Sequence, residues 1–490
     1  ARLRRPSVEF SVGHHHMAMG KSMRRHVTRR TALGMMGGTA LTATLPLARR
    51  SLASTAGAEI DIISARYSFF DGKITEGLVS TLPAAPPPVI RMKRNEPFIA
   101  SVTNRLEHFT TMHWHGLRLA NAMDGVPYLT QFPLGQDERF DYELFSPDAG
   151  TFWYHPHCVT MEQMALGLTG ILIVEEDEDP GFDSEIPLNL RDFRLDGEGR
   201  WLDLWTARGA ARGGTFGTVL TTNWQLSPDY QAGAGSLVRL RVAATDTTRI
   251  YKLFIPNAQA KIIALDGHPL PELIDMPSTE ETALFLGPGQ RADIAVLMPD
   301  TEGQQVNLMT DAPGEPHLLA RMTSQGSSTT RSISDLSPMP ANPVPEPDLS
   351  SARLEEFVFG WSPEGDLPNN GLCGSLPYTF WSINRTPWAG DAVEGVGPLA
   401  TFKRNESVVM RLRNESPNDH PIHLHGVAFR PIRSNKRTLP PYWTDTILLQ
   451  REETIDIAFV ADNPGDWAFH CHVIEHQKTG LAGYIRILDS

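Results

Sequence analysis

The chain has 490 residues, more than one hydrophobic core usually spans, so two or three domains are expected. Its composition, 41% hydrophobic and 21% charged, is ordinary for a soluble globular protein. The net charge of −13 becomes −22 without residues 1–58, which disfavours nucleic acid and anionic membranes as partners and favours metal ions and neutral or cationic small molecules.

The first 58 residues are expected to be absent from the working protein. Residues 1–22 lack an initiator methionine and contain His14-His15-His16, a pattern typical of a tag or vector sequence. Residues 23–58 hold a twin-arginine pair, a short apolar run rich in Gly and Thr, and small residues at the end, as in a twin-arginine export signal. That run is shorter than the roughly 20 residues that span a bilayer, and no later run approaches this length. The sequence predicts a periplasmic or secreted protein that is not inserted in a membrane once the signal is removed.

Residues 59–180 are predicted to form a first β-sandwich domain. They contain two His-x-His pairs, His113-Trp-His115 and His155-Pro-His157. Residues two apart on a strand share a face, so each pair presents two imidazoles together. One isolated pair is more often a polar strand edge than a metal site, and the case for metal depends on the number of pairs. A short helix is predicted directly after the second pair.

Residues 181–325 are predicted to form a second β-sandwich. Alternating or continuous β-branched runs bounded by Gly and Pro, at 236–242, 262–267 and 294–297, are typical of antiparallel strands. The segment has no paired histidines, so its predicted role is to space and orient its neighbours. Residues 326–350 are rich in Ser, Thr and Pro and are expected to be a linker.

Residues 351–490 repeat the first domain. The tetrapeptide Lys-Arg-Asn-Glu at 93–96 recurs at 403–406, and the same offset of 310 carries the first histidine pair to His423-Leu-His425. An offset of 315 carries the second pair to a His-Cys-His run, in which the cysteine replaces the proline of the first copy. Both copies should therefore have the same β fold, and only the later copy has a thiolate.

The run His470-Cys471-His472-Val-Ile-Glu-His476 places a cysteine between two histidines. On a strand, Cys471 would face one side while His470 and His472 face the other. A thiolate with two imidazoles, here His476 and the preceding His420, is typical of a blue-copper electron-transfer site. The eight remaining paired histidines are enough for three more metal ions at an interface to which each copy contributes four. Four metal ions could together hold four electrons, and Cys471 is joined by two short covalent paths to His470 and His472. This arrangement fits the four-electron reduction of O₂ to water.

The four motifs resemble those of three-domain multicopper oxidases of the bacterial, laccase-like kind, from about residue 59 to the C-terminus. The resemblance implies an all-β chain of three cupredoxin-like Greek-key β-sandwich domains. It also implies oxidation of phenols or aromatic amines coupled to reduction of O₂, with four copper ions: one type 1, one type 2 and two type 3. Carried over residue by residue, the type 1 ligands are His420, Cys471 and His476, the type 2 ligands His113 and His423, and the type 3 ligands His115, His155 and His472 for one ion and His157, His425 and His470 for the other.

Four residues near these motifs bear on proton supply and reduction potential. Asp124 matches an acid near the trinuclear site of the family and is the predicted proton relay, with an ordinary Asp-Gly turn as the alternative. Leu481, ten residues after the cysteine, stands at the axial position and cannot ligate, which predicts a relatively high reduction potential. Gln477 stands where some bacterial relatives have a glutamate, which puts one proton route in doubt, and Glu475 is not taken as its substitute.

The electron donor stays open. We expect donors to be oxidised at an exposed histidine, His476 or His420, and Asp445 is a candidate for the rim of the donor site, although a strand-start or turn role fits it better. A cuprous oxidase acting in copper tolerance, with Cu(I) as donor, is the alternative. The 16 methionines are scattered, with Met161 and Met164 the only close pair near a motif, which disfavours it. A copper-free structural protein of the cell-division kind would lack most ligands, and a copper nitrite reductase would not need four histidine pairs.

Three cysteines bear on the cellular compartment. If Cys471 binds copper, Cys158 and Cys373 are the only pair available for a disulfide, which an exported compartment permits. The sequence does not decide whether these two meet. It is equally silent on oligomeric state, and a monomer is expected because three-domain relatives are mostly monomers.

Overall fold

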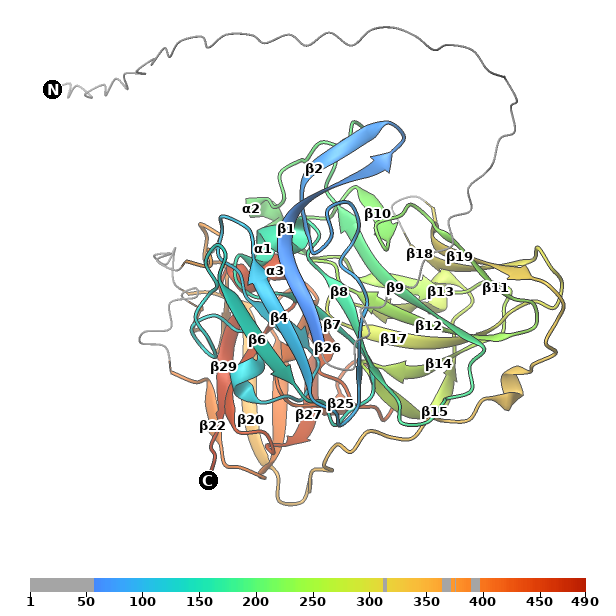
Figure 1. Cartoon of the computed structure of the whole chain (residues 1–490). Helices are drawn as coiled ribbons and strands as arrows, with labels where there is room; N and C mark the ends of the chain where they lie inside the picture. Colours follow the sequence, from blue (N-terminus) through green and yellow to red (C-terminus); the bar gives the residue numbers. More distant parts are fainter. Residues whose placement is uncertain (1–56, 312–314, 364–371, 375, 389–396) are drawn as a thin grey trace, which may run out of the picture. The chain divides into compact units, whose positions relative to one another are not determined.

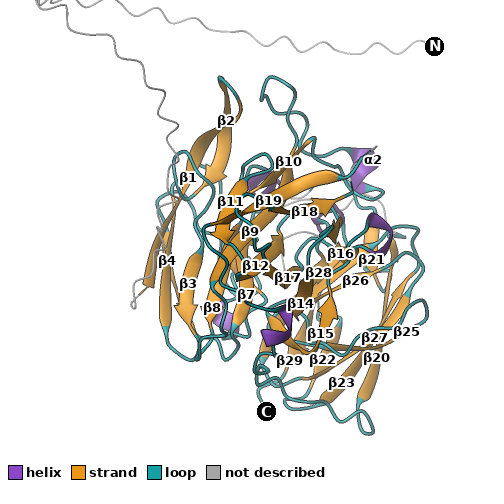
Figure 2. Cartoon of the chain, turned by 90° about the vertical axis from the view of Figure 1, so that its right-hand side faces the viewer, coloured by secondary structure: helices purple, strands orange, loops and turns teal. Residues whose placement is uncertain are grey.

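A computed structural model shows a chain built mainly of β-strands (Figures 1 and 2). It describes residues 57–311, 315–363, 372–374, 376–388 and 397–490. The predicted tag and all but the last two residues of the predicted export signal lie outside these residues. No helix in the described part of the chain is both long enough and apolar enough to cross a bilayer.

The first pair of sheets is built from eight consecutive strands. They are β1 (Gly57–Phe70), β2 (Lys73–Ser80), β3 (Ile90–Lys93), β4 (Phe98–Asn104), β5 (Met112–His115), β6 (Arg139–Leu144), β7 (Gly150–Pro156) and β8 (Gly170–Glu175). One sheet has the order β2-β1-β4-β6 and the other β3-β8-β7-β5. Buried Ala58, Ile60 and Ile62 alternate with exposed residues in β1, as expected where one face of a strand is covered. The predicted export signal therefore overlaps this strand by two residues.

The middle segment forms a second pair of sheets. Its strands are β9 (Ser184–Phe193), β10 (Val219–Thr222), β11 (Asp229–Gly233), β12 (Leu237–Ala244), β13 (Tyr251–Phe254), β14 (Ala260–Leu265), β15 (His268–Asp275), β16 (Leu284–Leu286), β17 (Arg291–Leu297), β18 (Gln305–Thr310) and β19 (His317–Gln325). The sheet orders are β10-β9-β12-β17-β14-β15 and β11-β19-β18-β13-β16. The three β-branched runs predicted as strands lie in β12, β14 and β17.

Strand β12 is buried along its whole length because its second face lies against the first segment. Its two arginines are therefore paired rather than solvated. The Arg239 guanidinium donates to Asp293 at 2.5 Å, and Asp293 in turn accepts from the Thr151 hydroxyl of β7 at 2.6 Å. A buried charge without such a partner would cost several kcal/mol, so this contact fixes how the middle sheet meets the first segment.

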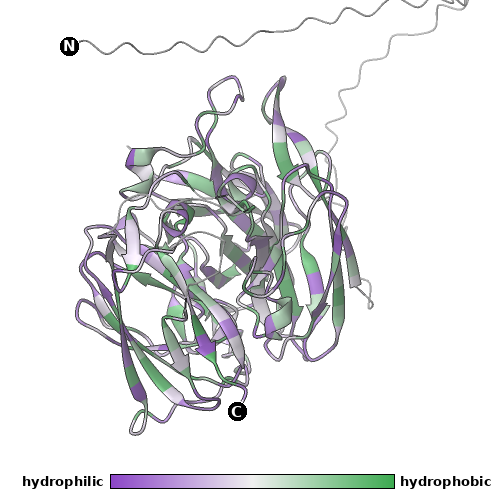
Figure 3. Ribbon diagram, turned by 90° about the vertical axis from the view of Figure 1, so that its left-hand side faces the viewer, coloured by the Kyte–Doolittle hydropathy of each residue, from purple (hydrophilic) through white to green (hydrophobic). Residues whose placement is uncertain are grey.

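The last segment forms the third pair of sheets. Its strands are β20 (Arg353–Trp361), β21 (Trp381–Ile383), β22 (Ala400–Phe402), β23 (Ser407–Asn414), β24 (His420–Leu424), β25 (Arg430–Ser434), β26 (Thr446–Leu449), β27 (Thr454–Val460), β28 (Gly465–Cys471) and β29 (Ala482–Ile487). The orders are β21-β20-β23-β27-β25 and β22-β29-β28-β24-β26. Hydrophobic and hydrophilic stretches are interspersed along the strands of the chain (Figure 3). The prediction of an all-β fold is confirmed, while the domain boundaries stay a prediction.

Helices are short in the described residues: α1 (Thr160–Ala165), α2 (Ala207–Ala210) and α3 (Ile474–Lys478), with 3₁₀ turns η1 (Asn121–Met123), η2 (Glu280–Thr282) and η3 (Ile333–Asp335). The helix predicted after the second histidine pair is α1, and α3 follows the His-Cys-His run at the equivalent place. The segment predicted as a linker, 326–350, contains η3 and no strand.

Cys158 and Cys373 form a disulfide, with their Cα atoms 4.5 Å apart. The bond answers the question that the sequence left open. It ties the residue after His157, in the first segment, to a loop of the last segment 215 residues later.

Replacing both Cys158 and Cys373 with Ser should lower the free energy of unfolding by about 2–4 kcal/mol, because the bond closes a long loop in the unfolded chain. Urea denaturation of the variant and of wild-type protein, each with and without reductant, measures the difference. Reductant should destabilise only the wild type. Equal stability of all four samples would contradict a structural role.

Candidate metal centres

Eight histidines lie in one buried interface, on the four strands β5, β7, β24 and β28 or directly after the ends of the last three. His113 pairs opposite His155 across β5 and β7, and His423 pairs opposite His470 across β24 and β28. Where the two copies meet, histidine rings of the first copy stack on histidine rings of the second. The ring of His115 lies 3.7 Å from that of His423, and the ring of His113 lies 4.0 Å from that of His425. The first histidine of each motif thus stacks on the second of the other copy, as a pseudo-twofold axis requires.

Each group of imidazoles draws on both copies. Donor atoms within 4.8 Å of one another come from three sets: His113, His115 and His423; His115, His155 and His472; and His157, His425 and His470. Burial is the main cause that lowers the pKa of the imidazoles of His115, His155, His157, His423, His425, His470 and His472. Neutral imidazole is the form that binds metal.

Many ring nitrogens in this interface have no hydrogen-bond partner among the described protein atoms, although buried polar atoms normally have one. They are Nε2 of His113, His155 and His423, Nδ1 of His115, and both ring nitrogens of His157 and His472. Cations bound between the strands would satisfy one nitrogen of each of these rings. The residues present therefore fit a cluster of metal ions, and imidazole is a suitable ligand for copper.

The thiolate group lies on the other face of β28, as the alternation of the strand predicts. Cys471 Sγ is 3.5 Å from His420 Nδ1 and 3.6 Å from His476 Nδ1, and these two nitrogens are 3.1 Å apart. Burial raises the pKa of the Cys471 thiol and lowers that of His476 to about 4. A thiol of this kind loses its proton when it binds a metal ion, so the three atoms fit one soft cation. Leu481 is buried beside them, and its carbonyl accepts from the Cys471 amide at 3.0 Å.

The expectation of an exposed histidine is wrong, because His420 and His476 are both fully buried. Residues 206–215 of the middle segment, which include α2, contact His476. His476 Nε2 donates to the Arg212 carbonyl, and the Thr215 hydroxyl at the end of these residues donates to Glu475 Oε1 at 2.7 Å. We call residues 206–215 the cap. The cap lies about 260 positions from α3 in the sequence, so no local sequence pattern predicts their contact.

Asp124 lies between the two copies. Its carboxylate Oδ2 is 2.9 Å from Nδ1 of His425, and its carbonyl is 2.8 Å from Nδ1 of His113. An imidazole that donates from Nδ1 keeps the lone pair of Nε2 free, so these contacts orient both rings for metal binding.

Asp445 does not lie at the rim of a donor site. It is 1% exposed, and its carboxylate contacts His115 Nε2 at 3.0 Å and the Arg291 guanidinium at 2.6 and 2.9 Å. Burial alone would raise the pKa of this carboxyl, but Arg291 and the neighbouring imidazole of His115 hold it well below its usual range. The alternative role at a strand start is confirmed, since β26 begins at the next residue.

The middle segment also reaches the histidines, which the sequence analysis missed. Arg291 is fully buried and pairs with Asp266 as well as with Asp445. Gly289, in a left-handed conformation at φ +91°, lies so close that an added Cβ would be 3.0 Å from atoms of His115 and His472. The available signal was a pair of opposite charges, Arg291 and Asp293, within an otherwise apolar strand.

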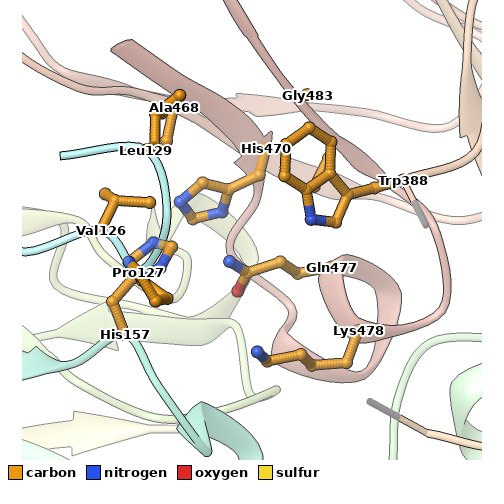
Figure 4. Close-up of a pocket in the computed structure, with 11 residues that line it drawn as sticks. Val126, Pro127, Leu129, His157, Trp388, Ala468, His470, Gln477, Lys478 and Gly483 are labelled. Atoms are coloured by element: carbon orange, nitrogen blue, oxygen red, sulfur yellow. The ribbon is translucent and has the colours of Figure 1, made fainter. Parts of the chain in front are cut away.

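A pocket of about 30 Å³, large enough for water, lies next to two of the eight histidines. His157 and His470 both line it (Figure 4). Gln477 and Lys478 extend from α3 toward His157 in the same view. The Gln477 side-chain carbonyl is buried without a partner among described residues, so it can accept a hydrogen bond from a molecule in the pocket.

Comparisons with known proteins agree with this arrangement. Models of the multicopper oxidase family match residues 68–179 and 374–489. The multi-copper oxidase of Pseudomonas thermotolerans is 36% identical, with a TM-score of 0.77, over 89% of this chain and all of that one. Multicopper oxidase MmcO of Mycobacterium tuberculosis is 27% identical over 95% of this chain and 94% of its own length. Laccase-2 of Botryotinia fuckeliana is 25% identical over 81% of this chain and 76% of its own length. The chain therefore belongs to the multicopper oxidase family, in its three-domain bacterial form.

Proposed function

We propose that the chain is a laccase-like oxidase, which couples one-electron oxidation of phenols or aromatic amines to four-electron reduction of O₂ to water. One observation carries this most: Cys471 of the thiolate group is bonded directly to His470 and His472 of the imidazole cluster. Copper, when bound, supplies the one-electron redox chemistry at both places. The proposed ligands are those that the family resemblance implies, one type 1 ion at the thiolate group, and one type 2 and two type 3 ions among the eight histidines.

The side chains around the cluster would manage protons and access. Asp124 is the proposed proton relay, because its carboxylate is buried among the imidazoles and accepts from His425. The pocket beside His157 and His470 is the proposed path for O₂ and water, since it reaches two proposed ligands. The Gln477 side chain in that pocket is an amide, which does not take up and release protons as a carboxylate does. Proton delivery along this path is therefore proposed to be slow.

A cuprous oxidase is the competing proposal. It would need soft donors near the thiolate group that are free to take up Cu(I). Met161 and Met164, the close pair noted in the sequence, are 1% and 0% exposed and pack in a hydrophobic cluster with Trp153 and Ile474. They are part of the core, which supports the phenol-oxidising function over the cuprous one.

The test is O₂ uptake by copper-loaded protein with a methoxyphenol and with Cu(I) as separate donors, each with a chelator for free copper. Fast uptake with the phenol in the absence of added Cu(II) would support the laccase function. Uptake with Cu(I) alone, or with the phenol only when excess Cu(II) is present, would support copper detoxification instead.

Two further proposals concern the state of the protein. Export by the twin-arginine route rests on Arg29-Arg30 and the apolar run that follows, which lie outside the described residues. A monomer is proposed because the copper sites are complete within one chain.

Replacing Leu481 with Met should lower the reduction potential of the thiolate site by about 60–120 mV, one to two factors of ten in the Cu(II)/Cu(I) equilibrium, because a thioether would stabilise Cu(II). Redox titration of the blue absorbance measures the shift. Leu481→Ile, which adds no donor atom, is the control. An unchanged or higher potential in the methionine variant would mean that Leu481 is not axial.

A further inference from the structure

The burial of both imidazoles of the thiolate group raises the question of how a donor in water delivers its electron. The described residues offer two contacts that lead outward from His476. One is the main-chain carbonyl of Arg212 in the cap, and the other is the indole ring of Trp381. The carbonyl is already engaged by the imidazole, and the exposed Arg212 carries no aromatic ring on which a phenol could stack.

Trp381, at the start of β21, contacts both imidazoles. Its ring centroid is 4.7 Å from that of His476 and 5.0 Å from that of His420. The residue is fully buried, and its indole N–H donates to the Ala210 carbonyl of α2 at 2.7 Å. Its backbone amide donates to Thr479 at 2.9 Å. These bonds fix the ring in place between the imidazoles and the next aromatic residue.

That next residue is Trp361, which pairs directly opposite Trp381 across β20 and β21. The two rings stack with centroids 4.2 Å apart and planes at 16°. Trp361 is 47% exposed. One face of its ring lies against Trp381, so the exposure of the residue comes from its remaining atoms. A continuous series of rings thus runs from the surface to both imidazoles that flank Cys471.

We propose that Trp361 is the surface at which aromatic electron donors dock, and that the stacked pair of Trp361 and Trp381 conducts their electrons to the thiolate group. This rests on the proposed function. Each phenol that docks loses one electron through the pair and one proton to water, and becomes a phenoxyl radical. Four such events supply the four electrons and four protons that convert one O₂ into two waters.

The chemistry of the exposed ring selects the donor class. An indole face binds other aromatic rings by offset stacking, which is favourable beyond simple burial. In the segment directly before Trp381, the partly buried rings of Tyr378 and Phe380 stack on each other with centroids 5.2 Å apart. No deep pocket is needed, and this suits donors too large to reach a buried histidine.

The first test uses metal-free protein and a probe that cannot be oxidised as a phenol, 1,2-dimethoxybenzene, with binding followed by ligand-observed NMR. Trp361→Ala should weaken binding about 2- to 10-fold, the equivalent of one lost aromatic contact. Trp361→Phe should keep most of the affinity. Trp201→Ala is the matched control, because Trp201 packs beside Phe193 in a separate cluster. Equal affinity in Trp361→Ala and wild type would overturn the docking site.

The second test uses copper-loaded protein without O₂ and follows bleaching of the blue absorbance by a methoxyphenol and by ferrocyanide. Trp361→Ala should slow bleaching by at least the same about 2- to 10-fold as the affinity, while the absorbance maximum and reduction potential stay unchanged. Unchanged rates with both donors would overturn the electron path. A wild type that ignores the phenol but is reduced by ferrocyanide, with the same dependence on Trp361, would refute the laccase function and uphold the path.

Discussion

Replacing Cys471 with Ser is expected to abolish the intense blue absorbance and to reduce turnover with phenols by about a thousandfold or more. A serine hydroxyl is a poor copper ligand, so the thiolate group would lose the donor that gives it its colour and its affinity. The covalent links from residue 471 to His470 and His472 remain, but no metal ion would be bound at residue 471 to pass electrons along them.

The fold should persist in this variant because serine is nearly the same size as cysteine, and the eight imidazoles of the cluster are untouched. Copper content should fall by one ion per chain, from the proposed four to three, and the electron paramagnetic signal of the proposed type 2 site should remain. Far-ultraviolet circular dichroism checks the fold. A variant that stays blue would refute the thiolate assignment, and one that loses all copper would mean that the two sites assemble together.

Replacing Arg291 with Leu should have the largest effect on stability. Arg291 is the buried partner of Asp445 and Asp266, and its removal leaves carboxylates unpaired in the core, at a cost of about 3–5 kcal/mol. The midpoint of urea unfolding measures this. Arg411→Leu is the matched control, since the Arg411 side chain is 28% exposed beside Asp456, and its loss should cost about 1 kcal/mol or less.

The loss of stability in Arg291→Leu should depend on pH in a definite direction. In wild type, Asp445 has a lowered pKa, so its contribution to stability is present at neutral pH and is lost as the pH falls through that low value. Without Arg291, the pKa of Asp445 would rise, because burial would be opposed only by the neighbouring imidazoles, and the charged form would be less favourable in the fold at neutral pH. The deficit of the variant should therefore be larger at pH 7 than at pH 5. A deficit no greater than that of Arg411→Leu, at either pH, would contradict the role assigned to Arg291.

The histidine motifs were predictable because their signal is local. Side chains on a strand alternate between faces, so the spacing within a His-x-His pair already determines that the two rings point the same way. The recurrence of the pairs at a nearly constant offset then indicated two copies of one domain, and the crossed stacking of His113 on His425 follows from that duplication.

The surroundings of the histidines could not be predicted in the same way. The contact of Asp445 with Arg291 joins positions 154 residues apart, and the cap reaches His476 across 264 residues. Such contacts depend on how three sandwiches dock, and docking leaves no periodicity in the sequence. For this reason His476 was expected at the surface, and the middle segment was expected to serve only as a spacer.

The two copies differ at the three positions that hold the thiolate group in the later one. The first copy has Thr110, Pro156 and Met161 there, and all three are buried, with the Thr110 hydroxyl bonded to Gln163. In evolutionary terms, a duplicated ancestor could not relax selection on its paired histidines, since each copy supplies half of the cluster. The thiolate pocket was under no such constraint, because one is sufficient. Divergence after the duplication could therefore fill the other pocket with ordinary core side chains while both sheets kept their strands and register.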